Sequence, residues 1–173
     1  MAETPVQKNP AMRLTIRPLA LSEIPILLSL IGELAEFERM SPRVTATEEK
    51  MRSALFGPHL FAEALLGWLD GEPIAYAVFH HTFSTFAALP GLYIEDIYVR
   101  PAHRGRGYGG KLMRHLARMA ASRGCASLSW SVLGWNEAAI RFYRNLGAVQ
   151  VTEWDAYNLS GEALRRLSAE SAG

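Results

Sequence analysis

The sequence predicts an α/β fold of the α+β kind, in which helices flank a sheet that is antiparallel in its middle. Two apolar runs, 61–69 and 74–83, surround an Asp-Gly pair, which is the pattern of a β-hairpin. A third run, 91–99, is rich in β-branched and aromatic residues and ends before Pro101. A helical segment followed by a strand at 126–132 then implies a right-handed crossover onto the sheet.

The first sixty residues predict a strand and two helices. The alternating segment 14–17 reads as a strand. Apolar residues spaced by three and four predict a helix that begins at Ser22. Thr45, with Glu48 three residues later, resembles a capping box, so a second and shorter helix is expected to follow and to end at Gly57.

The last seventy residues predict three more helices. A long amphipathic helix follows the glycine-rich segment and stops near Gly124. A helix over 136–146 ends at Gly147. Two short strands are expected around 154–159, and a tail helix is expected from about Ser160.

Length, charge and cysteine content limit the kinds of protein that this chain can be. The 173 residues predict a disordered leader over 1–12 and one domain over 13–173. The 18 basic and 17 acidic side chains nearly cancel, so we expect no nucleic-acid partner, and no apolar run has the length of a membrane span. A single cysteine, Cys125, excludes an internal disulfide and fits a reducing compartment. We therefore expect a soluble cytoplasmic protein.

A glycine-rich segment carries the strongest local signal. Gly105, Gly107 and Gly110 satisfy the spacing of the dinucleotide fingerprint, but no acidic residue follows about 20 positions later. The triphosphate-loop spacing ends at Lys111, where Leu112 replaces the required Ser or Thr. Closely spaced glycines at a helix start still predict N–H groups that bind a phosphate or pyrophosphate. The alternative is a glycine-rich turn with solvated arginines.

Two segments at the expected separation resemble signatures of the GCN5-related N-acetyltransferases, the GNAT superfamily. The first is 93–99 leading into 104–109, and the second is 135–148. Segments 34–40 and 159–164 resemble the diamine acetyltransferase branch, which includes spermidine/spermine and thialysine N-acetyltransferases. The resemblance implies a mixed, mostly antiparallel sheet whose central strands splay where acetyl-CoA inserts.

The resemblance also implies the residues that bind acetyl-CoA. The backbone at 97–99 would pair with the pantetheine arm like an added strand, and the Val99 N–H would polarise the thioester carbonyl. The pyrophosphate would lie on the glycine loop. The complete predicted set is Ile97, Tyr98, Val99, Arg104, Gly105, Arg106, Gly107, Tyr108, Gly109, Gly110 and Asn136. Asn136 is also a preferred helix N-cap and could serve only that purpose.

Catalytic roles follow from the same resemblance. Glu95 is the predicted general base, directly or through water, and Tyr143 the predicted general acid for the departing thiolate. Glu95 could instead be an ordinary sheet-edge carboxylate, and Tyr143 a core aromatic on one helical stripe. In a regular strand Glu95 and Asp96 would point to opposite faces, so only a bulge would let both serve one site.

The predicted acceptor is a primary amine of a small molecule, either a diamine or polyamine or a lysine-like amine. Its predicted binding residues are Phe37, Glu38, Glu95 and Asp96, which offer carboxylates and an aromatic face. The segment 85–90 lacks the Asp and Trp expected of spermidine/spermine enzymes, which leaves thialysine as an alternative.

Two other functions remain open: an acetyl-CoA sensor without turnover, and a protein N-acetyltransferase. Members of the resembled branch are usually homodimers, which implies a dimer here. His80 and His81 are adjacent on a strand and so face opposite sides, and we expect no metal site.

Overall fold

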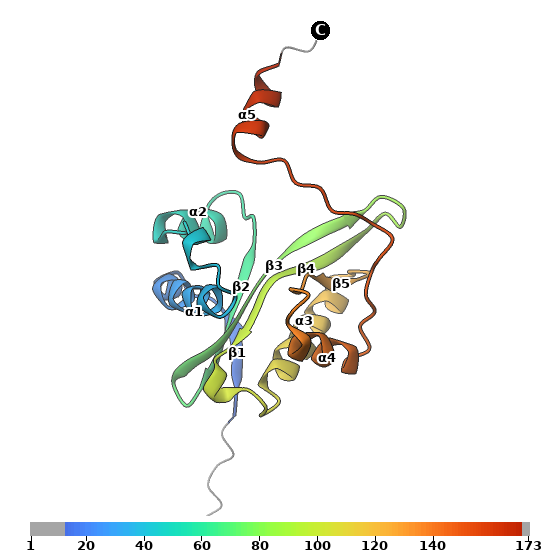
Figure 1. The fold of residues 1–173 in the computed structure, drawn as a ribbon. Helices are drawn as coiled ribbons and strands as arrows, with labels where there is room; N and C mark the ends of the chain where they lie inside the picture. Colours follow the sequence, from blue (N-terminus) through green and yellow to red (C-terminus); the bar gives the residue numbers. More distant parts are fainter. Residues whose placement is uncertain (1–12, 171–173) are drawn as a thin grey trace, which may run out of the picture. The chain divides into compact units, whose positions relative to one another are not determined.

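A five-stranded sheet organises the first of two compact parts of the chain (Figure 1). The computed structural model describes residues 13–170, and these divide into units 13–131 and 132–170. The predicted leader, 1–12, lies outside the described residues, and the single domain over 13–173 stays a prediction. The strands are β1 (Thr15–Pro18), β2 (Glu63–Leu69), β3 (Glu72–Ser84), β4 (Leu89–Val99) and β5 (Leu128–Trp130).

The sheet is mixed and mostly antiparallel, as predicted. Strands β1 to β4 pair in chain order and antiparallel, and β5 joins β4 in parallel. The turn between β2 and β3 is the predicted Asp-Gly pair, with φ of 51° at Asp70 and 83° at Gly71. Positive φ at both central residues is the geometry of the hairpin turn that matches strand twist. The predicted strand over 126–132 is shorter, because only its middle pairs with β4.

Helices pack on both faces of this sheet. Helices α1 (Ile24–Phe37) and α2 (Glu48–Phe56) cover one face, where Leu27 and Leu30 pack in one buried cluster with Tyr76 of β3 and Tyr98 of β4. Helix α3 (Tyr108–Ser122) covers the other face. Because strand side chains alternate, Tyr76, Val78 and His80 of β3 lie on the face of α1. The periodic apolar residues of all three helices predicted them correctly.

The cap of α2 differs from the predicted one. Thr47, not Thr45, precedes the first helical residue, and its hydroxyl accepts the Lys50 N–H at 3.3 Å. The Thr45 carbonyl instead accepts the Lys50 side-chain ammonium at 2.8 Å. Both threonines fit the preferred N-cap residue types, and only the backbone angles of the extended segment select between them.

We expect Thr47→Ala to lower the free energy of unfolding by about 1 kcal/mol, because the Lys50 N–H loses its cap. Thr45→Ala removes a hydroxyl that caps nothing and is the matched control. Thermal unfolding of the two variants checks this. A larger loss in Thr45→Ala would restore the predicted capping box.

The second unit contains α4 (Glu137–Asn145) and α5 (Gly161–Ala169), both close to the predicted positions. The two short strands predicted around 154–159 are wrong: this segment is irregular, and Trp154 and Tyr157 are exposed. β propensity becomes a strand only where a neighbouring strand supplies backbone partners, and the segment pairs with none. Among the described residues, no helix is both long enough and apolar enough to cross a membrane.

Candidate active site

A β-bulge in β4 brings two adjacent carboxylates to one face of the sheet. Asp96 is opposite Val78 of β3 and Ile94 is opposite Phe79, so Glu95 is the extra residue without a partner in the register. A bulge breaks the alternation of side chains. Glu95 contacts His80 and Asp96 contacts Tyr76, and both of these β3 residues lie on the α1 face. The structure therefore contains a bulge, which the sequence neither predicted nor excluded.

The two carboxylates have different surroundings on that face. The Glu95 Oε1 atom lies 3.0 Å from His80 Nε2, and 55% of the Glu95 side chain is exposed, so a substrate can reach it. Asp96 is deeper, and its Oδ2 atom accepts the Tyr76 hydroxyl at 3.2 Å. Burial raises the pKa of Asp96, the Tyr76 hydrogen bond opposes that change, and the charge of Glu95 adds to it.

A third carboxylate, Glu38, follows directly after α1. Partial burial raises its pKa, and the charge of Asp96 raises it further. Burial of the phenol raises the pKa of Tyr76, and the charges of Asp96 and Glu38 add to this, so Tyr76 stays a neutral hydrogen-bond donor. Glu38 and Asp96 thus form an acidic, half-buried cluster, and an ammonium group placed beside them would relieve both the repulsion and the desolvation.

The edge of β4 beyond this cluster is open. Strand β5 pairs with β4 only at Leu92, Tyr93 and Ile94, and within residues 13–170 no strand pairs with the rest of β4 on that side. The parallel pairing therefore ends at Ile94, one residue before the bulge. An extended, amide-containing chain can hydrogen-bond to such an edge as an additional strand does.

The glycine loop follows β4 and forms the start of α3. Gly105 and Gly107 have φ of 74° and 80°, so both occupy the left-handed region that favours glycine. Gly107 is the N-cap of α3, and no side chain caps this end. The first N–H groups of a helix have no intrahelical acceptor, and here they remain available to an anion. The geometry fits the pyrophosphate role predicted for the loop.

Arg104 connects this loop with the acidic cluster. Its Nε atom donates to the Val99 carbonyl oxygen at 2.8 Å, which fixes the exit of β4. Its guanidinium lies 4.6 Å from the ring centroid of Phe37 and 5.5 Å from that of Tyr98, within the range of cation–π interactions. Phe37, at the end of α1, therefore lies beside the cofactor loop as well as next to Glu38 in the chain.

Comparisons with known proteins agree with this geometry. Residues 30–148 match the acetyltransferase (GNAT) family. The chain is 37% identical over 155 residues to a thialysine N-epsilon-acetyltransferase from Bos taurus, covering 83% of this chain and 91% of that protein. It is 26% identical to an L-ornithine N5-acetyltransferase from Arabidopsis thaliana, covering 84% of each chain. The chain belongs to the acetyltransferase (GNAT) family.

The solved structures agree on the fold. An integron cassette protein from V. cholerae superposes with a TM-score of 0.77 at 24% identity, covering 92% of this chain and 100% of that chain. The chain is an acetyl-CoA-dependent N-acetyltransferase of the diamine branch of its family. Family members use acetyl-CoA, and the open β4 edge with the uncapped helix start provides groups suited to its pantetheine arm and pyrophosphate.

Two predicted site residues of this acetyltransferase lie in the second unit. Asn136 caps α4, and its Oδ1 atom accepts the Ala139 N–H at 3.2 Å. Asn136 is therefore an N-cap, and its contact with the pantetheine arm, which the cap does not exclude, stays a prediction. Tyr143 lies on α4 with its ring 5.3 Å from that of Phe142. Its role as the general acid also stays a prediction.

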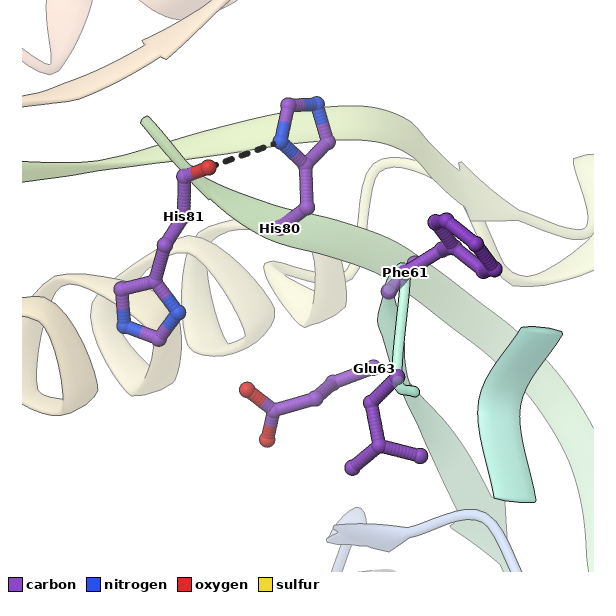
Figure 2. Close-up of a pocket in the computed structure, with 6 residues that line it drawn as sticks. Phe61, Glu63, His80 and His81 are labelled. Atoms are coloured by element: carbon purple, nitrogen blue, oxygen red, sulfur yellow. Dashed lines mark hydrogen bonds between the residues drawn. The ribbon is translucent and has the colours of Figure 1, made fainter. Parts of the chain in front are cut away.

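Sequence reasoning missed His80 as a partner of Glu95. The signal was the register of β3 and β4, which puts His80 opposite Tyr93 and therefore two residues from Glu95. His80 and His81 do point to opposite sides of β3, as predicted (Figure 2). Within the described part of the chain, no group of three or more His, Cys, Asp or Glu side chains could hold a metal ion.

Proposed function

We propose that this enzyme transfers an acetyl group from acetyl-CoA directly to the terminal primary amine of a small lysine-like or diamine substrate. The observation that carries the proposal is the bulge, which gives one face of the sheet both an exposed carboxylate, Glu95, and a half-buried one, Asp96. The first can accept a proton, and the second can attract the cation. The names of the relatives, a thialysine and an L-ornithine acetyltransferase, support amines of this size.

Recognition of the cofactor follows from the chain's own donors. When bound, acetyl-CoA supplies a thioester whose carbonyl carbon accepts the amine. The β4 edge around 97–99 would hold the pantetheine arm, and the Val99 N–H would polarise the thioester oxygen. The first turn of α3 with Gly105 and Gly107 would bind the pyrophosphate, while Arg106 adds positive charge.

Proton transfer then has a base and an acid. Substrate amines are protonated near neutral pH, so Glu95 removes one proton, directly or through water, and leaves a nucleophilic lone pair. Attack forms the C–N bond and breaks the C–S bond. Tyr143 donates its phenolic proton to the leaving thiolate. Glu38 and Asp96 bind a second positive charge of the substrate, with the ring of Phe37 beside it.

The proposal also covers the oligomeric state, the cellular location and the rival functions. We expect the enzyme to act as a homodimer in the cytoplasm without a nucleic-acid or membrane partner, as its nearly balanced charge suggests. Retention of Glu95 and Tyr143 argues against an acetyl-CoA sensor without turnover. A protein amino terminus as the acceptor would not need the acidic cluster formed by Glu38 and Asp96.

Replacing Asp96 by Asn should make the protein more stable and the amine bind less well. Burial raises the pKa of Asp96, so its ionised form destabilises the folded protein. This cost is absent below the Asp pKa of the unfolded chain, about 3.9, and is complete above the raised folded-state value. We expect Asp96→Asn to raise Tm by roughly 2–4 °C at pH 7, a gain that disappears as the pH falls toward about 4.

The same variant should raise the amine KM by about tenfold, because one charge of the acidic cluster is lost. Asn keeps an oxygen that accepts the Tyr76 hydroxyl, so the packing is unchanged. Thermal unfolding as a function of pH, with steady-state kinetics, checks both effects. A lower Tm at pH 7 together with an unchanged KM would contradict the assignment.

The acceptor is tested by measuring thiol release from acetyl-CoA with thialysine, lysine, ornithine, putrescine and spermidine. We expect saturable release with the lysine-like amines, and weaker release with spermidine, because the segment 85–90 lacks the Asp and Trp of spermidine/spermine enzymes. No release with any of these amines, despite CoA binding, would favour the sensor.

A further inference from the structure

The imidazole of His80 lies between two oxygen atoms, the carbonyl oxygen of His81 and Oε1 of Glu95. When Glu95 is ionised, neither oxygen carries a proton, so both can only accept hydrogen bonds. His80 Nδ1 lies 3.1 Å from the His81 carbonyl oxygen, and Nε2 lies 3.0 Å from Glu95 Oε1. Figure 2 shows the first of these contacts. A carbonyl oxygen has no proton to give, so Nδ1 must carry one. The proton of a neutral His80 is thereby fixed on Nδ1.

This tautomer determines what happens at the other nitrogen. With the neutral ring protonated on Nδ1, Nε2 presents a lone pair toward a carboxylate oxygen. Two acceptors at 3.0 Å repel each other unless a proton lies between them. The 3.0 Å contact is therefore that of the pair with one additional proton, the state that follows proton transfer from the substrate. The pair accepts the next proton after this one has left.

We propose that His80 is the proton-holding partner of Glu95 in catalysis, so that the pair, rather than Glu95 alone, receives the proton of the substrate ammonium. This inference rests on the proposed function. In the step, the ammonium N–H bond breaks, its proton comes to lie between Glu95 Oε1 and His80 Nε2, and the amine lone pair attacks the thioester. In this step His80 contacts the transferred proton and not the amine, so it acts through Glu95.

The surroundings of His80 leave Glu95 as its only carboxylate partner among the described residues. On β4 the ring lies 5.4 Å from that of Tyr93, whose hydroxyl pairs with Ser131. From β2, Glu63 is bound by Arg123, which directly follows α3, with Nη2 to Oε2 at 2.8 Å. His81 points to the opposite side of β3, toward Glu63. These groups are engaged elsewhere and do not compete for His80 Nε2.

Solvent can reach the pair. His80 lines a cavity of about 300 Å³ together with Phe61, Glu63 and His81, and 31% of its side chain is exposed. The cavity lies beside the start of β2, and no residue of β4 lines it. After each turnover, the shared proton can leave through water in this cavity without crossing the substrate.

The activity test compares His80→Gln with His81→Gln. Glutamine can donate an amide hydrogen bond to Glu95 but cannot hold a proton. We expect His80→Gln to lower kcat by about tenfold or more, with the amine KM little changed. It should also change the shape of the kcat/KM profile against pH, because the pair has lost one of the two groups that hold the proton. His81→Gln should match the wild type. Unchanged kcat and profile in His80→Gln, or equal losses in both variants, would overturn the proposal.

A second readout is independent of turnover. Nitrogen-15 NMR of histidine-labelled wild-type protein should show neutral His80 protonated on Nδ1, and Glu95→Gln should alter its Nε2 signal far more than that of His81. A neutral ring protonated on Nε2 would overturn the pairing even if the enzyme acetylates amines. The Nδ1 tautomer in a protein that acetylates none of the amines would uphold the pair and reject the proposed function.

Discussion

Glu95→Gln is expected to lower kcat/KM for the amine by about 10²–10⁴, the range that a general base contributes. Glutamine has nearly the shape of glutamate and can still accept a hydrogen bond, but it cannot take a proton from the substrate. Glu95 is exposed, and the bulge leaves it without a partner in the β3 register, so the substitution should not disturb the sheet. Initial rates of thiol release at saturating acetyl-CoA measure the effect.

The control for this variant is cofactor affinity. Titration of CoA into Glu95→Gln should give the wild-type Kd, because the glycine loop lies beyond the end of β4 and is untouched. The loss should also exceed that of His80→Gln, since His80 acts only through Glu95. Near-normal turnover in Glu95→Gln would show that another group, or water alone, removes the proton.

Gly107→Ala is expected to weaken CoA binding by about tenfold or more, because the complex loses about one charge-assisted hydrogen bond to the pyrophosphate. Gly107 has φ of 80° and is the N-cap of α3, so an added Cβ favours a different backbone there. The N–H groups of the first turn would then point away from the pyrophosphate. Calorimetric titration of CoA measures the change.

Gly124→Ala provides the matched control for backbone strain. Gly124 has φ of 70°, follows the other end of α3, and has open space where its Cβ would lie, just as Gly107 has. Both variants should lose about 1 kcal/mol of stability, from the same left-handed strain. Only Gly107→Ala should lose CoA affinity. Equal affinities in the two variants would mean that the loop does not hold the phosphates.

Local chemistry explains what could be predicted from the sequence. The Asp70-Gly71 turn, the periodic apolar face of α3 and the positive φ of Gly105 and Gly107 each depend on a few neighbouring residues. Such features are encoded by turn preferences and by the spacing of apolar side chains. The fold class and the glycine loop could therefore be predicted from these local features, and the family from the resemblance of 93–99, 104–109 and 135–148 to its signatures.

Non-local pairing explains what could not be predicted. The bulge at Glu95 depends on how β3 and β4 align, and nothing near Glu95 in the sequence marks it. The His80 to Glu95 contact follows from the same alignment. The strands expected around 154–159 do not form for the converse reason, since their β-forming residues find no neighbouring strand. The Thr47 cap was missed because two threonines satisfy one local rule.

Direct transfer to an amine is tested by initial rates measured while acetyl-CoA and thialysine are both varied, with mass analysis of the product. The geometry predicts that the open edge of β4 and the acidic cluster of Glu38 and Asp96 are filled together. Reciprocal plots should therefore intersect, and thialysine should gain one acetyl group for each thiol released. Parallel plots with an acetylated enzyme, or thiol release without an acetylated amine, would contradict the account.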